Sequence, residues 1–243
     1  MSDDKQSPNP APSLDTASTA NAPMLSRAAW ARILPVLVYL LFIVIADLLG
    51  RLGVSEPALR WLYPLKIFAV VVTLVICWRH YQELHTVRLS PIWAGIAVLV
   101  GVVVFVLWIS LSTGWMLIGS PAGFDPRTNG QVDWLLVGLR IAGAALVVPV
   151  MEELFWRSFL IRWLDNTDFT SVDPARIRWQ SMAIGAVLFG FEHNLWLAGI
   201  VAGVAYSVLY MRQRSLWSAI LAHAVTNGIL GVWIVHAGQW TFW

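Results

Sequence analysis

The stretch VPVMEELFWR, residues 148–157, places two adjacent carboxylates and an arginine inside a long apolar segment. A charged side chain at the centre of a membrane-spanning helix costs about 2.5–3.5 kcal/mol on insertion scales. Glu152 and Glu153 therefore lie either at an exposed helix end or at a functional site within the membrane. The mostly apolar residues that follow, up to Leu160, argue against a fully exposed end and favour a functional site.

The composition of the chain is that of an integral membrane protein. Of its 243 residues, 58% are hydrophobic and 12% are charged, whereas soluble domains have about 45–50% apolar and about 25% charged residues. The formal net charge of +2 is too small to indicate a nucleic-acid partner. The single cysteine, Cys77, gives neither a disulfide framework nor a cysteine-rich metal site.

Hydrophobic segments of nearly membrane-spanning length recur along the chain. A spanning helix needs about 20 residues, with about 17–25 tolerated. The pattern predicts an all-α, polytopic membrane helical bundle with about seven transmembrane helices, and eight as the alternative. The fourth segment is longer than one span, so we expect its last turns to form an interfacial extension that carries Arg157, Arg162 and Trp163. The predicted helices cover residues 33–50, 62–79, 92–118, 132–163, 179–194, 195–212 and 215–236.

Three regions are expected along the chain. Residues 1–29 are rich in Ser, Pro, Ala and Asn, and we expect a disordered cytoplasmic tail there. Residues 30–131 would hold the N-terminal transmembrane helices, and residues 132–243 a core that carries the polar motifs. Arginine and lysine concentrate at one set of segment ends, which predicts a cytoplasmic N-terminus. Basic residues in the first outside loop, Arg51 and Lys66 among them, run against this trend.

The two adjacent carboxylates are expected to have different surroundings. Glu153 and Arg157 are spaced i, i+4, so they share a helical face and can form an ion pair. Glu152 is rotated by about 100° from its neighbour and has no such local partner. Pro149 removes a helical hydrogen bond and should kink the helix, which would turn Glu152 inward.

Two further polar pairs occur in later apolar segments. Phe189 and His193 are spaced i, i+4, and so are His223 and Asn227. Taken singly, a histidine in an apolar segment is more often a satisfied structural residue, and a His–Asn pair can join helices with about 0.6–2 kcal/mol. Glu192 beside His193 is explained equally well as a charge at a helix end.

The depths of these side chains change this interpretation. At about 1.5 Å per residue, Glu152 lies roughly 15 Å from Arg162 and His223 lies roughly 14 Å from Arg214. By the same measure His193 and Asn227 also reach the middle of the bilayer. Four uncompensated polar groups at one depth are more simply explained by a single hydrated cavity than by four separate structural roles.

This set of side chains supports the hydrolysis of an amide bond. Glu152 with His193 could hold and deprotonate a water molecule, while His223 and Asn227 could donate hydrogen bonds to a tetrahedral oxyanion. Zinc is the alternative, because Glu152, His193 and His223 are a plausible three-ligand set that leaves one position open. The sequence lacks an H-E-x-x-H helix, and only Glu153 or Glu192 would remain as a base. A metal-free site is therefore preferred.

The ordered trio of motifs resembles a known family. EExxxR at residues 152–157, FxxxH at 189–193 and HxxxN at 223–227 are similar to the three motifs of the CAAX protease and bacteriocin-processing (Rce1-like) membrane protease family. The resemblance covers residues 132–236 and implies a glutamate intramembrane endopeptidase without a cofactor. It implies that Glu152 and His193 activate the water and that His223 with Asn227 forms the oxyanion hole. The supporting residues that it implies are Glu153, Arg157 and Phe189.

The text around these motifs is similar to one branch of that family. EELFWR and LAGIVAG, at residues 152–157 and 197–203, resemble the bacterial CAAX-protease-related branch that is linked to exosortase protein sorting. This implies a bacterial inner (cytoplasmic) membrane location, a functional link to an exosortase system, and a membrane-delivered peptide or protein as substrate.

Two other functions stay open from the sequence. A non-catalytic scaffold or immunity-type protein would have the same motifs, since such roles occur among relatives of the family. A transporter with Glu152 as its proton site is a weaker alternative, because no inverted repeat of broken helices relates the two halves.

Overall fold

The computed structural model describes residues 25–119 and 123–243. Most of the tail predicted at 1–29 lies outside these residues. The first helix, α1, begins at Arg27, two residues before the predicted end of the tail, because the Ser26 hydroxyl caps it by accepting a hydrogen bond from the Ala29 amide at 3.2 Å. Ala29 is buried, so this boundary belongs to the folded bundle.

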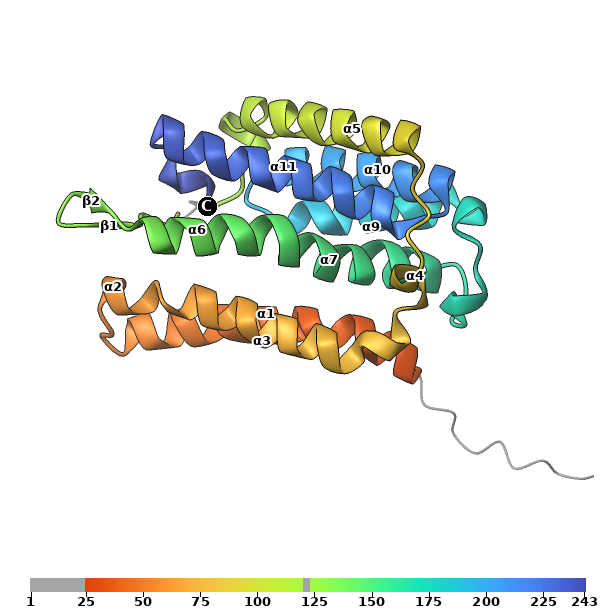
Figure 1. Cartoon of the computed structure of the whole chain (residues 1–243), viewed down its shortest axis with the longest axis horizontal. Coiled ribbons are helices and arrows are strands. Elements are labelled where there is room, and N and C mark those ends of the chain that lie inside the picture. Colours follow the sequence, from red (N-terminus) through yellow and green to blue (C-terminus); the bar gives the residue numbers. More distant parts are fainter. Residues whose placement is uncertain (1–24, 120–122) are drawn as a thin grey trace, which may run out of the picture.

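The described chain is an all-α helical membrane bundle, as predicted. Figure 1 shows long helices running side by side, with α1 and α3 on one side of a long central helix and α9 to α11 on the other. Seven helical passes can be followed in the described residues: α1 (Arg27–Arg51), α3 (Leu62–Cys77), α5 (Pro91–Ser110), the continuous α6 to α8 (Trp134–Trp163), α9 (Trp179–Phe191), α10 (Trp196–Gln213) and α11 (Leu216–Ala237).

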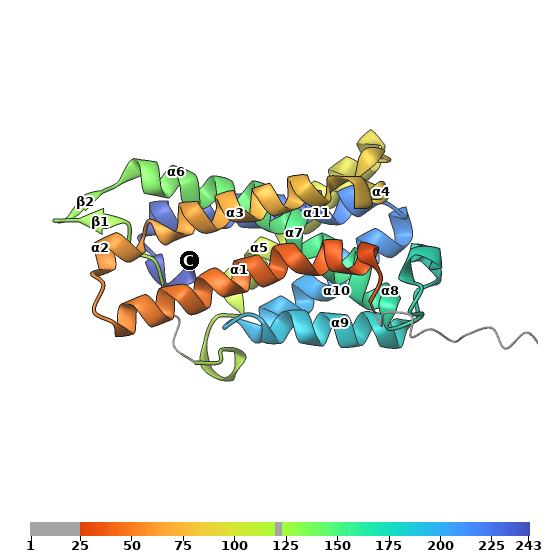
Figure 2. The same ribbon diagram turned by 90° about the horizontal axis from the view of Figure 1, so that it is seen from below.

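Short elements connect these passes. Both views place α4 and α8 with the start of α1 at one end of the bundle, the α4 end, and α2 with the β-hairpin at the other, the hairpin end (Figures 1 and 2). The connecting elements are α2 (Glu56–Leu59), α4 (Gln82–His85), β1 (Arg127–Thr128) paired antiparallel with β2 (Gln131–Val132), and 3-10 turns at Trp78–His80, Gly114–Met116, Phe169–Ser171, Pro174–Arg176 and Trp240–Phe242.

The outer surface of the bundle suits a lipid environment. Five passes among the described residues are long and apolar enough to cross a membrane, and α9 is a shorter apolar helix. Large apolar side chains such as Phe68 and Ile76 are exposed on these helices, at 64% and 75%. In water this surface would be unfavourable, whereas lipid tails solvate it.

One boundary differs from the prediction for physical reasons. The third segment was expected to be helical to residue 118, but α5 ends at Ser110. Leu111 leaves the helical conformation, and Gly114 has a φ of +61°, which favours glycine and ends any continuation. The expected extension of the fourth segment is the end of the same continuous α6 to α8 helix, and Arg157 and Arg162 on it are buried inside the protein. Arg162 donates to the carbonyl oxygens of residues 158, 170 and 172, which replaces contact with head groups.

The long central helix is not a regular α-helix. Two π-helical segments, Gly143–Val147 and Leu154–Leu160, interrupt it on either side of α7 (Val148–Glu153); α6 (Trp134–Ala142) precedes them and α8 (Ile161–Trp163) follows. The predicted disturbance at Pro149 takes this form, since a proline lacks the amide that would continue the hydrogen-bond ladder. Each π-helical turn changes the direction in which the residues after it point.

A polar network fixes the second π-helical segment at the α4 end. Arg32 of α1 donates to Glu83 of α4 at 2.7 Å and to the Ser158 hydroxyl at 2.9 Å, and Ser158 also bonds Glu83. Arg32 and Ser158 are buried. The network therefore ties α1 and α4 to the segment that directly follows Glu153.

Candidate active site

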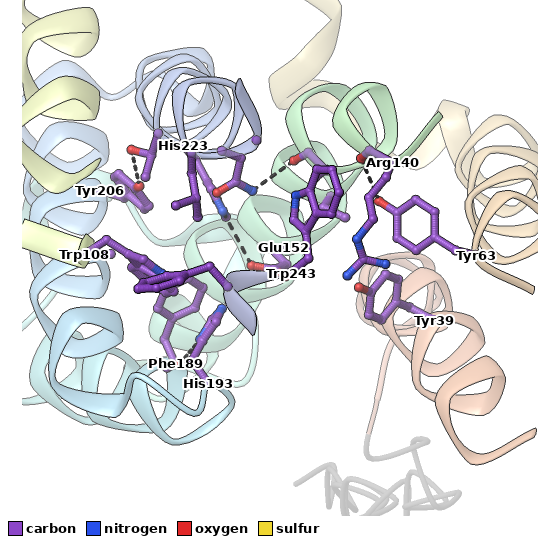
Figure 3. A pocket seen from close by; sticks show the side chains of 18 residues that line it. Tyr39, Tyr63, Trp108, Arg140, Glu152, Phe189, His193, Tyr206, His223 and Trp243 are labelled. Carbon is purple, nitrogen blue, oxygen red and sulfur yellow. Dashed lines mark hydrogen bonds and ion pairs between the residues drawn. The ribbon is translucent and has the colours of Figure 1, made fainter. Parts of the chain in front are cut away.

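The four side chains predicted to carry the chemistry lie around one cavity. This inner cavity has a volume of about 200 Å³, and Glu152, His193, His223 and Asn227 line it from α7, the α9–α10 turn and α11 (Figure 3). The rest of its wall is largely aromatic and apolar: Tyr39, Tyr63, Trp108, Arg140, Ala144, Val148, Phe189, Ala202, Tyr206, Thr226, Leu230, Gly231, Phe242 and Trp243.

Glu152 has an unsatisfied carboxylate. It is 6% exposed, and among the described residues its Oε2 atom has no hydrogen-bond partner. The nearest basic atom is His223 Nε2, at 3.8 Å, which is beyond hydrogen-bond distance. Glu152 as a residue lines the inner cavity, and a carboxylate there with unused acceptor capacity is suited to bind a water molecule.

Glu153 bridges two elements instead. Its Oε1 accepts a hydrogen bond from Arg157 Nη1 at 3.1 Å, which is the predicted i, i+4 ion pair. The same oxygen lies 2.9 Å from His223 Nδ1 on α11. No pattern in the sequence indicates this second contact, because the two residues are 70 positions apart. Glu153 therefore orients His223 so that Nε2 of that ring faces Glu152.

Arg157 is enclosed by the protein. It is 1% exposed, and its Nη2 donates to the Gly203 carbonyl oxygen on α10 at 3.3 Å. Its guanidinium carbon lies 4.5 Å from the centre of the Phe189 ring. Phe189 in turn contacts His193, at 4.8 Å between ring centres. Phe189, predicted only as a supporting residue, thus packs between the arginine and the histidine.

His193 has a defined tautomer when it is neutral. Its Nδ1 lies 2.8 Å from the carbonyl oxygen of Phe189, and a carbonyl can only accept a hydrogen bond. Nδ1 therefore carries the proton, and Nε2 keeps its lone pair. Trp108 of α5 packs edge-on against the ring, at 5.2 Å between centres. His193 is thus prepared to accept a hydrogen bond from a water in the cavity.

Aromatic packing also fixes His223. The ring of Tyr206 on α10 stacks on it, with 4.9 Å between centres and an angle of 19°. The Tyr206 hydroxyl donates to Thr226 at 2.8 Å, and Thr226 donates to the Gly101 carbonyl of α5 at 2.9 Å. Sequence reasoning missed Tyr206 and Trp108, since an aromatic residue in an apolar segment looks like ordinary core.

Asn227 satisfies a carbonyl that Pro149 leaves unpaired. Val148 donates its amide to Gly143 across a π-helical turn. The next carbonyl, that of Ala144, would be paired with residue 149, which as a proline has no amide hydrogen. Asn227 Nδ2 donates to the Ala144 oxygen at 2.9 Å in its place. One amide hydrogen of Asn227 is used in this way, and the other stays available at the inner cavity.

A second cavity continues from the first toward the hairpin end. This outer cavity, of about 500 Å³, is lined by Glu152 and His193 again, and by Glu192, which accepts a hydrogen bond from Trp156 Nε1 at 3.1 Å. Residues near the ends of helices and in connecting segments form another part of its lining: Ser112, Leu117, Asn194, Leu195, Thr241, Phe242 and Trp243. Glu152 and His193 lie where the two cavities meet.

The positions of these side chains also decide whether the site could bind a metal ion. Within residues 25–119 and 123–243, no three His, Cys, Asp or Glu side chains gather as a metal-binding group. The alternative ligand set Glu152, His193 and His223 lines the inner cavity without converging on one point. As arranged here, these three side chains do not fit a zinc ion.

Comparison with protein families agrees with the motifs. Residues 134–229 match the family described as Type II CAAX prenyl endopeptidase Rce1-like. The segment that is similar to this family begins with α6, ends within α11 and contains all three motifs. No curated protein and no solved structure matches the chain. The narrower resemblance, to the exosortase-linked branch, stays a prediction.

Proposed function

We propose that the protein is an intramembrane endopeptidase that hydrolyses a peptide bond near the end of a membrane-associated protein. The observation that carries the proposal is the unsatisfied Glu152 oxygen at a cavity that also contains His193, His223 and Asn227. The match of residues 134–229 to a family of endopeptidases supports it independently.

Glu152 and His193 activate the water in this mechanism. The water donates one hydrogen bond to the Glu152 carboxylate and the other to His193 Nε2. Its oxygen attacks the carbonyl carbon of the peptide bond as its proton passes to Glu152. The same proton is then given to the departing amine nitrogen as the carbon–nitrogen bond breaks, so Glu152 returns to its initial state.

His223 and Asn227 stabilise the tetrahedral oxyanion. Asn227 contributes the amide hydrogen that the Ala144 carbonyl does not use. His223 Nδ1 donates to Glu153, and Nε2 of the same ring, when it also carries a hydrogen, donates to the oxyanion. Glu153 and Arg157 thus support the donor rather than react themselves.

We propose that no metal takes part. The donor set does not gather three ligands, and Glu152 lines the cavity with an oxygen that accepts no hydrogen bond among the described residues. Purified protein treated with EDTA and analysed for zinc by mass spectrometry should keep its full cleavage activity. Loss of activity with EDTA and recovery with stoichiometric zinc would establish the zinc enzyme instead.

The Glu152→Gln variant tests the proposed function. It removes the base while keeping size and shape, so cleavage should fall by about 10²–10⁴-fold. Membrane-protein termini from cells with the wild type or the variant would be compared by mass spectrometry, which also identifies the substrate.

The matched control is Asp47→Asn, an exposed carboxylate of α1 that lines none of the cavities described here and should leave cleavage unchanged. If Glu152→Gln protein folds and keeps all cellular phenotypes and all cleavage, the chain is a scaffold or immunity-type protein. The proposed location is a bacterial inner membrane with a cytoplasmic N-terminus, and the exosortase link belongs to the same proposal.

A further inference from the structure

Two cations outside the proposed catalytic set share one aromatic cluster. Lys66 Nζ of α3 lies 3.7 Å from the centre of the Tyr39 ring and 5.1 Å from that of Tyr63. The guanidinium carbon of Arg140 on α6 lies 4.5 Å from the Tyr63 ring centre. The Tyr63 hydroxyl donates to the Arg140 carbonyl oxygen at 3.1 Å, which fixes the backbone there. Figure 3 shows the Arg140 side chain beside Tyr39.

These cations have no anionic partner in the described part of the chain. Neither Lys66 nor Arg140 forms an ion pair there. Glu56 and Asp125 line a neighbouring cavity of about 500 Å³ with them, but Asp125 is paired with Arg127 at 2.6 Å. Aromatic rings attract a cation without neutralising it. Two like charges held together in a partly buried place are unfavourable unless an anion joins them.

The two cations line the same cavities as the proposed catalytic residues. Arg140 lines the inner cavity together with Glu152 and His193, and both Arg140 and Lys66 line the outer cavity with the same two residues. A ligand bound at the cations therefore lies in the same space as the proposed reaction centre. This continuity favours a group of the substrate over a separate ligand.

We propose that Lys66 and Arg140 form a subsite for a carboxylate of the peptide substrate. The inference deepens the proposed function and rests on it. Arginine presents a planar fork that binds a carboxylate with two hydrogen bonds, and lysine adds a point charge. The carboxylate belongs either to the C-terminus of the substrate or to an acidic side chain, and Arg140 and Lys66 would bind both in the same way.

The spacing along the central helix limits where this carboxylate lies in the substrate. Arg140 precedes Glu152 by twelve residues, which is about 18 Å of helix at 1.5 Å per residue. An extended peptide covers about 3.3 Å per residue, so about five residues span that distance. The anionic group is therefore at most about five residues from the cleaved bond.

Binding of matched peptides tests the subsite without turnover. The probes are N-terminally acylated peptides made in two forms, with a C-terminal carboxylate or carboxamide, and a second pair with Glu or Gln inside the sequence. Each pair is offered to Glu152→Gln protein in neutral detergent, and retained peptide is quantified by mass spectrometry. The carboxylate forms should be enriched by about tenfold or more, and the better of the two pairs identifies the source of the carboxylate.

Adding Arg140→Gln or Lys66→Met to this protein should remove most of the enrichment and leave amide peptides unaffected. Arg51→Gln, an exposed cation at the same end of the bundle, should keep it. Since each change removes an unpaired charge, the thermal midpoint should not fall. If the Arg140→Gln protein does not fold, peptide retention by the Lys66→Met protein alone tests the subsite.

Equal retention of both peptide forms overturns the subsite, even where cleavage requires Glu152. Loss of a co-purifying anionic phospholipid in the variants, with unchanged peptide selectivity, assigns the cations to a lipid phosphate and also overturns it. Carboxylate enrichment in a protein whose cleavage does not depend on Glu152 refutes the proposed mechanism while the subsite stands.

Discussion

At the scale of single residues, Glu152 and Glu153 are neighbours with opposite surroundings. Glu153 compensates the buried Arg157 and holds His223, whereas Glu152 has an oxygen without a partner among the described residues. Glu153→Gln leaves the guanidinium buried and uncompensated, which should cost about 3–5 kcal/mol of stability. Thermal unfolding in detergent measures the loss.

Glu152→Gln, the same type of substitution at the neighbouring residue, is the control for this prediction. Glu152→Gln removes a carboxylate whose one ionic contact among the described residues is His223 Nε2 at 3.8 Å, so the midpoint of unfolding should fall much less than in Glu153→Gln. Equal losses of stability in the two variants would contradict the different roles assigned to them.

The predictability of these residues depends on the range of their contacts. The Glu153–Arg157 pair was foreseeable, because an i, i+4 spacing fixes geometry within one helix. The Glu153–His223 contact was not, because it depends on how α7 packs against α11. Lys66 gave a misleading signal: in the charge pattern it only opposed the predicted orientation, whereas in the fold it lies beside Tyr39 at the outer cavity.

At the scale of elements, the central helix depends on Pro149. Without an amide at this position, the Ala144 carbonyl is left for Asn227. Pro149→Ala supplies a competing amide that can regularise the helix and release the asparagine. Misplacing a reacting group by about 1 Å can reduce turnover by about a hundredfold, and we expect a loss approaching that size in kcat, measured on the identified substrate.

Pro35→Ala is the matched control for the central helix. Pro35 also lies inside a helix, α1, but it lines none of the cavities described here. Its replacement should leave kcat unchanged. If the two proline variants have the same activity, the π-helical segment does not position the site.

At the scale of the whole molecule, the outer cavity faces the hairpin end. Ser112 and Thr241 line it, whereas Arg79 and His85 lie near the opposite, α4 end. With a cytoplasmic N-terminus, the cavity opens to the outside. In a Cys77→Ala background, Ser112→Cys should react with a membrane-impermeant maleimide in intact cells, and His85→Cys only after permeabilisation.

The labelling experiment has its own internal control. Cys77 is the single cysteine of the chain and is buried, so its removal gives an unreactive background. The reverse labelling pattern would invert the proposed orientation and open the cavity to the cytoplasm.

Hydrophobicity predicted the helical bundle because it is a local property averaged over about 20 residues. Of the seven predicted spans, five are long and apolar enough in the described residues to cross a membrane, and α9 and α10 are not among them. Hydrophobicity could not place the ends of the helices, as α5 shows, since Leu111 and Gly114 stop that helix through backbone conformation. Nor could it foresee that Arg157 and Arg162 are buried, because Arg157 bonds the Gly203 carbonyl, 46 positions away, and Arg162 bonds carbonyls of the irregular segment that follows its helix. The fold class was thus readable from the sequence, and the detailed site was not.

The thirteen residues of α9 have a consequence for the surrounding bilayer. Such a helix rises about 20 Å, while the hydrocarbon core is about 30 Å thick. Lipids beside α9 must thin locally, or the turn at His193 must sit beneath the head groups. Either adjustment shortens the path from the aqueous phase to the cavity on that side. In either case the turnover of the protein should depend on the acyl-chain length of the surrounding lipids.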